Sequence, residues 1–299
     1  MKNIGIIANS TKPGTLQVTA EVSDWLRERN ITTFVTDDCA LAIDSGNCIS
    51  MQAEEIVRHA DALVVFGGDG TVLRVSHIPG VTKIPILPVN MGGLGFLTEV
   101  ALDELYTALN RVLDGEYELD ERMMLRARLY EPEANELVVE RYALNDAVIN
   151  KGTFSRMIWL ESYIDGEYMA TCNGDGLIVS TPSGCTAYSL SAGGPIVCPN
   201  LNVFVITYIC PHNLTFRPQI VPSESKISIV VKSYHSNILL SIDGQEAFNL
   251  QPDSLIEIDE APDTIKLIRS HKRSYYEILR TKLKWGEIVK SPENTKFKS

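Results

Sequence analysis

The sequence lacks the long hydrophobic runs, cysteine motifs and basic excess that mark membrane proteins, zinc centres and general nucleic-acid binders. No stretch of its 299 residues approaches the ~18 apolar residues of a membrane span. The apolar run within residues 1–9 is too short for the hydrophobic part of a signal peptide. The six cysteines form no C-x-x-C pair and have no histidine at zinc spacing. We expect a cytoplasmic protein with reduced thiols and no membrane partner, and the alternative is a metal or disulfide framework.

Basic side chains are also fewer than acidic ones. The chain has 38 acidic and 27 basic side chains, so its formal net charge is −11. This sign disfavours a nucleic-acid partner, which usually requires a basic surface. The hydrophobic share of 44% and the charged share of 22% are ordinary for a globular protein of one large or two average domains. The charge raises a question: if the ligand is an anion, what neutralises it?

Short apolar runs alternate with helical patterns over the first hundred residues. The expected strands are 3–8, 31–35, 62–66 and 84–89, and the expected helices are 16–28, 53–59 and 101–113. Strands separated by helices predict parallel βαβ units, with ligands bound outside the carboxyl ends of the strands. We therefore expect an α/β, Rossmann-like domain over residues 1–120.

Hairpin signals replace helical periods after about residue 120. Asp165-Gly166 and Asp243-Gly244 each separate two strand-like runs, and Asp-Gly is typical of a type I′ turn. Further strands are expected at 227–232, 255–258 and 264–268. These features predict an all-β sandwich over residues 121–271. A helix at 274–283 would return to the first domain, which residues 272–299 would complete, and residues 286–299 are expected to fray.

The strongest motif is Gly67-Gly68-Asp69-Gly70-Thr71, directly after the apolar run 62–66. Glycines at a strand end allow a sharp turn and leave backbone N–H groups free to bind phosphate without a lysine. A carboxylate in such a turn would repel phosphate, so it suits a general base or a Mg²⁺ contact better. The alternative is a glycine-rich turn with a solvated aspartate. The motif is not a P-loop, and Gly93-x-Gly95 fails to complete G-x-G-x-x-G because residue 98 is threonine.

The pentad is shared by NAD kinases, diacylglycerol and sphingosine kinases and, in variant form, phosphofructokinases. Further blocks decide between them: residues 90–97, Asn145-Asp146, 175–195, 211–214 and Asp243-Gly244-Gln245 occur in the order of the NAD kinase signatures. The lipid kinases lack the second and third of these blocks. From its first strand to about Trp285, the chain resembles the NAD kinase family.

This resemblance implies phosphorylation of the 2′-hydroxyl of the adenosine ribose of NAD by ATP and Mg²⁺ (or another divalent cation), giving NADP. Asp69 would be the catalytic base. The phosphate-binding residues would be Gly67, Gly68, Gly70 and Thr71. The residues implied to bind NAD are Asp69, Gly70, Arg74, Phe96, Leu97, Asn145, Asp146, Arg156, Asn173, Asp175, Thr186, Ala187, Tyr188, Ser189, Leu190, Ser191 and Gln245. No residue is assigned as a protein ligand of a metal. The family also implies a homodimer or homotetramer.

Ordinary structural roles remain open for several of these positions. Asn145-Asp146 alone is also typical of a turn, residues 183–186 of a helix cap, Arg156 of a solvated charge and residues 243–245 of a plain hairpin. His212 receives no role. Two positions depart from the family: Asn173 stands where arginine is frequent, so one cationic contact is absent or comes from a neighbouring subunit. Cys185 stands where serine is usual, and its thiol is a weaker hydrogen-bond donor.

Two other functions remain possible at this stage. A related kinase could act on a lipid or a sugar, although no amphipathic segment indicates a membrane substrate. A sensor could bind NAD(P) without turnover, although a pure sensor gains little from a carboxylate in the glycine turn.

Overall fold

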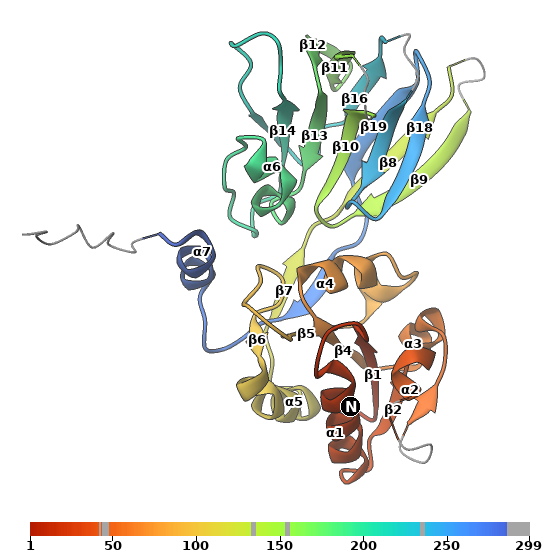
Figure 1. Cartoon of the computed structure of the whole chain (residues 1–299), viewed down its shortest axis with the longest axis vertical. Coiled ribbons are helices and arrows are strands. Elements are labelled where there is room, and N and C mark those ends of the chain that lie inside the picture. Colours follow the sequence, from red (N-terminus) through yellow and green to blue (C-terminus); the bar gives the residue numbers. More distant parts are fainter. Residues whose placement is uncertain (42, 44–47, 133–135, 153–155, 234–236, 286–299) are drawn as a thin grey trace, which may run out of the picture.

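The computed structural model describes the chain except residues 42, 44–47, 133–135, 153–155, 234–236 and 286–299 (Figure 1). The predicted fraying of 286–299 therefore lies outside the described residues. The described chain forms an α/β part and an all-β part stacked along the long axis of the molecule. The two parts agree with the fold class expected from the sequence.

The α/β part is built on one largely parallel sheet, with strand order β3-β2-β1-β4-β5-β20-β7 and β6 paired to β5. Its strands are β1 (Asn3–Ala8), β2 (Thr32–Val35), β3 (Ile49–Ser50), β4 (Ala62–Gly67), β5 (Ile86–Asn90), β6 (Val100–Ala101), β7 (Leu119–Arg122) and β20 (Ile265–Ile268). The sequential order runs outward in opposite directions from β1 and β4. The carboxyl ends of these two strands are therefore a topological switch point, where open α/β sheets bind ligands.

Helices cover both faces of this sheet. α1 (Thr15–Arg27) and α5 (Leu105–Asp114) pack on one face, and α3 (Ala53–His59) and α4 (Asp69–Ser76) pack on the other. The short α2 (Asp37–Ala40) follows β2. Apolar residues recur at helical spacing on each buried face, such as Val22 and Leu26 of α1, and their burial stabilises the layers. α5 ends at Gly115, whose φ of 77° is a left-handed conformation that glycine adopts freely.

One strand lies in a different sheet from the one expected. The sequence groups residues 264–268 with the all-β half, whereas β20 pairs with β7 and contacts β5 through Leu267 and Ile86. Ile265 and Leu267 are buried in the same cluster as the α3 and α4 faces. An apolar alternation predicts a strand but does not specify its partner. The chain therefore returns to the first sheet at β20, before α7 (Tyr275–Leu283).

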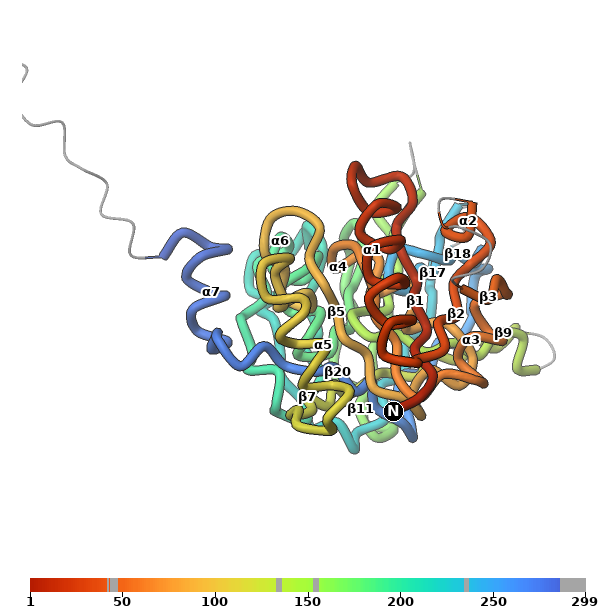
Figure 2. Tube along the Cα trace, turned by 90° about the horizontal axis from the view of Figure 1, so that it is seen from below, coloured from red at the N-terminus to blue at the C-terminus, as the bar shows by residue number. Residues whose placement is uncertain are grey.

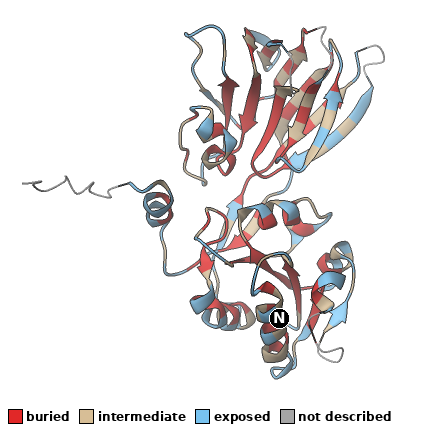
Figure 3. Cartoon of the chain, in the orientation of Figure 1, coloured by how far each residue is buried: buried red, intermediate tan, exposed pale blue. Residues whose placement is uncertain are grey.

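The all-β part consists of two six-stranded antiparallel sheets packed face to face (Figure 3). The strand order of one sheet is β15-β14-β13-β10-β17-β18, and that of the other is β12-β11-β16-β19-β8-β9. The strands are β8 (Leu125–Tyr130), β9 (Leu137–Ala143), β10 (Asp146–Lys151), β11 (Ile158–Ile164), β12 (Glu167–Gly174), β13 (Gly176–Ser180), β14 (Val203–Ile209), β15 (Gln219–Pro222), β16 (Ile227–Val231), β17 (Ile238–Ile242), β18 (Glu246–Leu250) and β19 (Leu255–Glu260). The inward side chains of both sheets form one apolar core.

Both predicted Asp-Gly hairpins are confirmed. Asp165 and Gly166 join β11 to β12 with φ angles of 52° and 83°. Asp243 and Gly244 lie between β17 and β18 with φ angles of 49° and 63°. Two successive positive φ values are what a type I′ turn requires.

Helix α7 lies at the side of the molecule, clear of the helices that cover the first sheet (Figure 2). Its N-cap Ser274 and Glu277 bond reciprocally through side chain and backbone, which explains why the helix begins there. Tyr275 donates to the carbonyl of Val197 in the all-β part, and Arg273 pairs with Glu104 of the α/β part. The segment around α7 therefore contacts both parts.

Candidate active site

The glycine turn lies at the carboxyl end of β4 and opens helix α4. A Cβ on Gly67 would overlap the side chain of Thr71, one turn into the helix. The hydroxyl of Thr71 accepts from the N–H of Gly68 at 3.4 Å. The carbonyl of Gly67 accepts from Met91, which joins this turn to the loop after β5. The first N–H groups of a helix have no acceptor within it, so this turn presents donors to a ligand.

The carboxylate of Asp69, the first residue of α4, organises the neighbouring loop. Its Oδ1 accepts from the backbone N–H groups of Leu97 and Thr98 and from the Thr98 hydroxyl, all at 3.0–3.1 Å. Its Oδ2 accepts from the N–H of Phe96 at 2.9 Å. A Cβ on Gly95 would overlap Asp69 Oδ1, so only glycine fits at that position. Asp69 is therefore bound to the Phe96–Leu97 segment, which the family resemblance implies to bind NAD.

The side chain of Asn90 holds the same loop from its other end. Its amide donates to the carbonyl of Gly93 and to the hydroxyl of Thr98, each at 2.8 Å, and its Oδ1 accepts from Gly92. The glycines of 92–95 let the backbone curve around this side chain. Sequence reasoning places Asn90 in a family block but gives it no role.

A buried carboxylate of the all-β part fixes the Asn145-Asp146 segment. Oδ1 of Asp243 accepts from the N–H groups of Asn145 and Asp146, and Oδ2 accepts from that of Leu144, at 2.8–2.9 Å. His77, which ends α4, places its Nε2 3.0 Å from Oδ2. Asp243 therefore connects the helix that begins at Asp69 to the segment before β10. The sequence indicates a hairpin at Asp243, and this second role has no local signal.

Asn145 and Asp146 are both buried polar residues. Oδ1 of Asn145 is buried without a hydrogen-bond partner. Burial and the negative charge of nearby Asp243 raise the pKa of Asp146 to about 7. Leu144 and Leu97 belong to the same apolar cluster, so this segment and the loop bound by Asp69 pack on one core.

The long signature block wraps the other side of Asn145. Thr181 donates its N–H to the carbonyl of Asn145 and its hydroxyl to that of Leu144. A Cβ on Gly184 would overlap the backbone of Asn145, so a glycine is required for this close approach. The short helices η3 (Gly184–Thr186) and α6 (Tyr188–Ser191) follow. Thr186, Ala187, Tyr188, Leu190 and Ser191 retain exposed surface on them.

Ser189 and Cys185 of the signature block do not face a ligand. Ser189 is fully buried and bonds to the hydroxyl of Thr207 at 2.9 Å, so its hydroxyl faces β14. Cys185 is also fully buried, and burial raises the pKa of its thiol to about 11. A raised pKa and burial both oppose thiolate reactivity.

Three predicted residues lie in the all-β part at the opposite end of β10 and β13 from Asp146. Asp146 pairs with Ser180 and Asn150 with Gly176, so the start of β13 is about four residues, or ~13 Å, from Asp146. Asp175 lies at that end, beside Asn173 of β12, and its carboxylate pairs with Lys151 Nζ at 2.8 Å. Oδ1 of Asn173 is buried without a partner. Arg156 is exposed in the segment between β10 and β11.

Other predicted residues take different positions. Arg74 is exposed on α4 and lines a hollow with Asn9, Thr11 and Asp38. The side chain of Leu97 is buried in the apolar cluster, so only its backbone faces Asp69. Gln245 is exposed in the β17–β18 turn.

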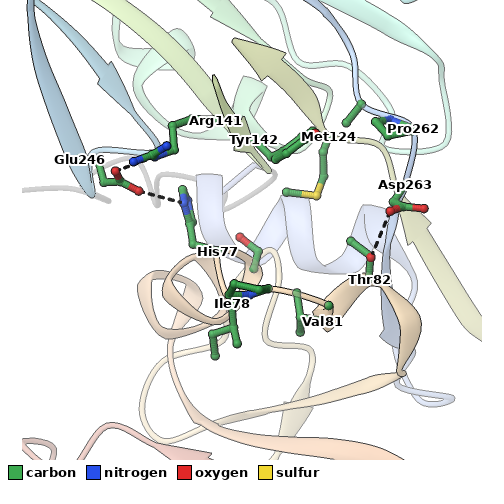
Figure 4. Close-up of a pocket in the computed structure, with 14 residues that line it drawn as sticks. His77, Ile78, Val81, Thr82, Met124, Arg141, Tyr142, Glu246, Pro262 and Asp263 are labelled. Atoms are coloured by element: carbon green, nitrogen blue, oxygen red, sulfur yellow. Dashed lines mark hydrogen bonds and ion pairs between the residues drawn. The ribbon is translucent and has the colours of Figure 1, made fainter. Parts of the chain in front are cut away.

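A hollow of about 500 Å³ separates the two parts of the chain on the side of His77 (Figure 4). Glu246 lies between Arg141 and His77 there, and Met124 and Val81 supply apolar wall. None of the residues predicted to bind NAD lines this hollow. It therefore lies outside the site built around Asp69 and Asn145.

Lys12 is a residue that sequence reasoning missed. Its Nζ lies 3.2 Å from the position that a Cβ would occupy on Gly68. The lysine is 56 residues earlier in the chain, and only the parallel pairing of β1 with β4 brings the two together.

Within the described ranges, no three His, Cys, Asp or Glu side chains are grouped closely enough to hold a metal ion. No helix of the same ranges is long and apolar enough to cross a membrane. All six cysteines are free.

Comparison with known proteins gives consistent matches over both parts. A family model described as the ATP-NAD kinase N-terminal domain matches residues 4–117, and one described as the ATP-NAD kinase C-terminal domain matches residues 144–270. The NAD kinase of Geotalea daltonii is 44% identical over 96% of this chain and all of that protein. The NAD kinase of Moorella thermoacetica is 42% identical over 98% of this chain and 93% of that protein.

Solved structures match as well. Yeast NADH kinase complexed with NADH superposes with a TM-score of 0.88 at 27% identity, over 96% of this chain and 89% of that chain. An NAD kinase from Archaeoglobus fulgidus in complex with ATP gives a TM-score of 0.73 at 22% identity, over 94% of this chain and 98% of that chain. At this lower identity the second match shows the shared fold alone.

Proposed function

Since this chain belongs to the NAD kinase family and is a kinase, we propose that it phosphorylates the 2′-hydroxyl of the adenosine ribose of NAD with ATP, Asp69 being the general base. The observation that carries this proposal is the convergence of Asp69, the Phe96–Leu97 segment and Asn145-Asp146. These groups come from both parts of the chain. Leu97 and Leu144 belong to one apolar cluster, and Asp243 links His77, at the end of α4, to the N–H groups of Asn145 and Asp146.

The hydrogen bonds of Asp69 leave one atom suited to the proposed role. A carboxylate has about four lone-pair sites, two on each oxygen. Oδ1 accepts three hydrogen bonds, whereas Oδ2 accepts one. Oδ2 therefore retains capacity for the proton of a ribose hydroxyl, and the loop bonds fix its direction. A positioned base of this kind needs to accept the proton only as phosphoryl transfer proceeds.

Asn145 and Asp146 suit recognition of a nucleoside. The orphaned Oδ1 of Asn145 would gain a donor from bound NAD, which removes the cost of burying it unpaired. Asp146, with its pKa near 7, can accept from a hydroxyl when ionised and donate when protonated. At the far end of the sheet, Asn173 and Asp175 would contact the nicotinamide half of NAD. Together with Arg156, they would lie where a neighbouring subunit of a homodimer or homotetramer could complete the site.

The donor phosphates would bind at the glycine turn, where backbone amides meet the N-terminus of α4. Mg²⁺ accompanying ATP would supply further positive charge there. The described part of the chain offers no cluster of ligands for a resident ion, which fits a cation held mainly by the phosphates. The six free cysteines support a reducing, cytoplasmic location.

A coupled assay for NADP formation with ATP and Mg²⁺ tests the function. Wild-type protein should convert NAD, and Asp69→Asn should lose at least about a hundredfold in kcat, because the base is gone. Thr98→Val is the matched control, since it removes the hydroxyl that donates to Asp69 and accepts from Asn90 but leaves the carboxylate. It should keep most of the turnover. Normal turnover by Asp69→Asn would show that another group takes the proton.

A substrate panel separates the remaining enzymes. NAD, NADH, diacylglycerol and fructose 6-phosphate are offered under the same conditions, because one structural relative is a kinase complexed with NADH. Phosphorylation of a lipid or a sugar in place of the dinucleotides would contradict the proposal. Calorimetric NAD binding without ADP release would indicate a sensor.

A further inference from the structure

Lys12 is held in place by the loop that follows β1. The N–H of Asn9 donates to the carbonyl of Phe66, which ties this loop to the end of β4. Oδ1 of Asn9 accepts from both the N–H and the hydroxyl of Thr11, and the N–H of Lys12 donates to the carbonyl of Asn9. This turn fixes the backbone of Lys12 at the carboxyl edge of the sheet.

The ammonium of Lys12 lies against two glycine turns. Its Nζ is 3.2 Å from the position of a Cβ on Gly68 and 3.9 Å from that of a Cβ on Gly92. Gly68 follows β4 and Gly92 follows β5, so the cation lies where the loops after three neighbouring parallel strands meet. β1 and β4 are also the strands that flank the switch point. A side chain on either glycine would narrow the space that the ammonium faces.

Lys12 also lacks the acidic partner that Arg273 and Arg122 have. Arg273 pairs with Glu104, and Arg122 pairs with Asp120. Lys12 forms no ion pair with any residue that the structure describes, although it is half-buried. The nearby carboxylate of Asp69 is directed instead to the N–H groups of residues 96–98. A half-buried ammonium without an anion is poorly compensated for its partial loss of water.

We propose that the Lys12 ammonium binds the phosphate chain of the phosphoryl donor, together with the backbone of the Gly68 and Gly92 turns. The inference rests on the proposed kinase function, and it adds a donor-binding residue on the α/β part. A lysine acts on phosphate as a compact point charge with three donors, which suits a site whose other donors are backbone amides. Polyphosphate and ATP share this phosphate chemistry, so both are tested as donors.

The position of Lys12 predicts that replacing it weakens binding of the phosphoryl donor and not binding of NAD. Lys12 belongs to the loop after β1, whereas Asn145, Asp146 and the signature block belong to the all-β part. Replacing Lys12 with methionine keeps most of the apolar stem and removes the charge. We expect the KM for ATP of Lys12→Met to rise about ten- to a hundredfold, the loss typical of one charged hydrogen-bonding partner. The KM for NAD should stay within about twofold.

Two variants serve as controls. Lys83→Met changes net charge equally at an exposed lysine of the same part, and it should leave both KM values unchanged. Lys12→Arg keeps the charge and should recover most of the affinity for ATP. Calorimetry with Mg²⁺-ATP in the absence of NAD measures donor binding without turnover, and it should show the same loss for Lys12→Met.

Protection from chemical labelling tests the wild-type protein directly. ATP should slow acetylation of Lys12 by acetic anhydride but not that of Lys83, whereas NAD should protect neither. Polyphosphate should protect Lys12 only if it also serves as a donor. An unchanged KM for ATP in Lys12→Met, or labelling of Lys12 that ATP does not slow, would overturn the inference.

If the wild type forms no NADP while ATP still protects Lys12, the proposed function is refuted but the inference about Lys12 is not.

Discussion

Replacing Asp243 with asparagine is the sharpest structural test of how the two parts of the chain are joined. The carboxylate is fully buried and contacts four groups: the N–H groups of Leu144, Asn145 and Asp146, and Nε2 of His77. Asparagine has nearly the same shape but only one acceptor oxygen. Its amide N–H₂ must therefore face at least one backbone N–H, which leaves a buried donor unpaired.

The cost can be worked from these contacts. One buried donor without a partner costs about 1–3 kcal/mol, and losing a hydrogen bond to a charged group costs about 1.5–3 kcal/mol. Asp146 would gain in part, because the neighbouring negative charge that raises its pKa is lost. We expect a net loss of about 2–4 kcal/mol in the free energy of unfolding, or roughly 3–6 °C in Tm.

Thermal unfolding followed by circular dichroism measures this change. The matched control is Asp253→Asn, because Asp253 also lies in a turn at positive φ, is 45% exposed and pairs with Lys232. An exposed pair contributes at most about 1 kcal/mol, so this variant should lose little stability. Asp243→Asn should also raise the KM for NAD, because the Asn145-Asp146 segment loses its anchor. A Tm within about one degree of wild type would refute the account of Asp243 as a buried anchor.

Two further predictions concern Asp146 and Gly95. Folding raises the pKa of Asp146 from 3.8 to about 7. Between these pH values the folded protein retains a proton that the unfolded chain releases. The free energy of unfolding therefore falls as the pH rises through this range. Asp146→Asn removes this titration. Urea unfolding should show that the stability of the variant relative to wild type increases from pH 4 to pH 7 by up to ~4 kcal/mol. A stability difference that does not change with pH would contradict the raised pKa. In Gly95→Ala the new Cβ would overlap Asp69 Oδ1, so the variant should lose about 1–3 kcal/mol of stability and most of its turnover. Gly93→Ala is its control, because no heavy atom lies within 4 Å of that Cβ position, and equal activity losses in the two variants would contradict the role of close packing at Gly95.

Local patterns predict the elements of this fold well, because most of them are decided within a few residues. The strand before Gly67 is a continuous apolar run, α3 ends where its pattern ends, and the Asp165-Gly166 turn carries its own φ preference. The position of β20 could not be predicted in the same way. Its alternation fits either sheet, and the choice depends on pairing with β5 and β7, which lie well over a hundred residues earlier.

The cations of the site could not all be identified from local sequence patterns either. The sequence suggests Arg74 and Arg156 as the cations available to two anionic ligands, because both occur near family motifs. In the structure Arg74 is exposed on α4 and lines a hollow beside the loop after β1, and Arg156 lies in the segment between β10 and β11. The cation next to the glycine turn is Lys12, which no motif marks, because its position follows from the parallel pairing of β1 and β4. A net charge of −11 is therefore compatible with anionic substrates: one placed lysine and a row of backbone amides act locally, where the distant surface carboxylates are screened by water and salt.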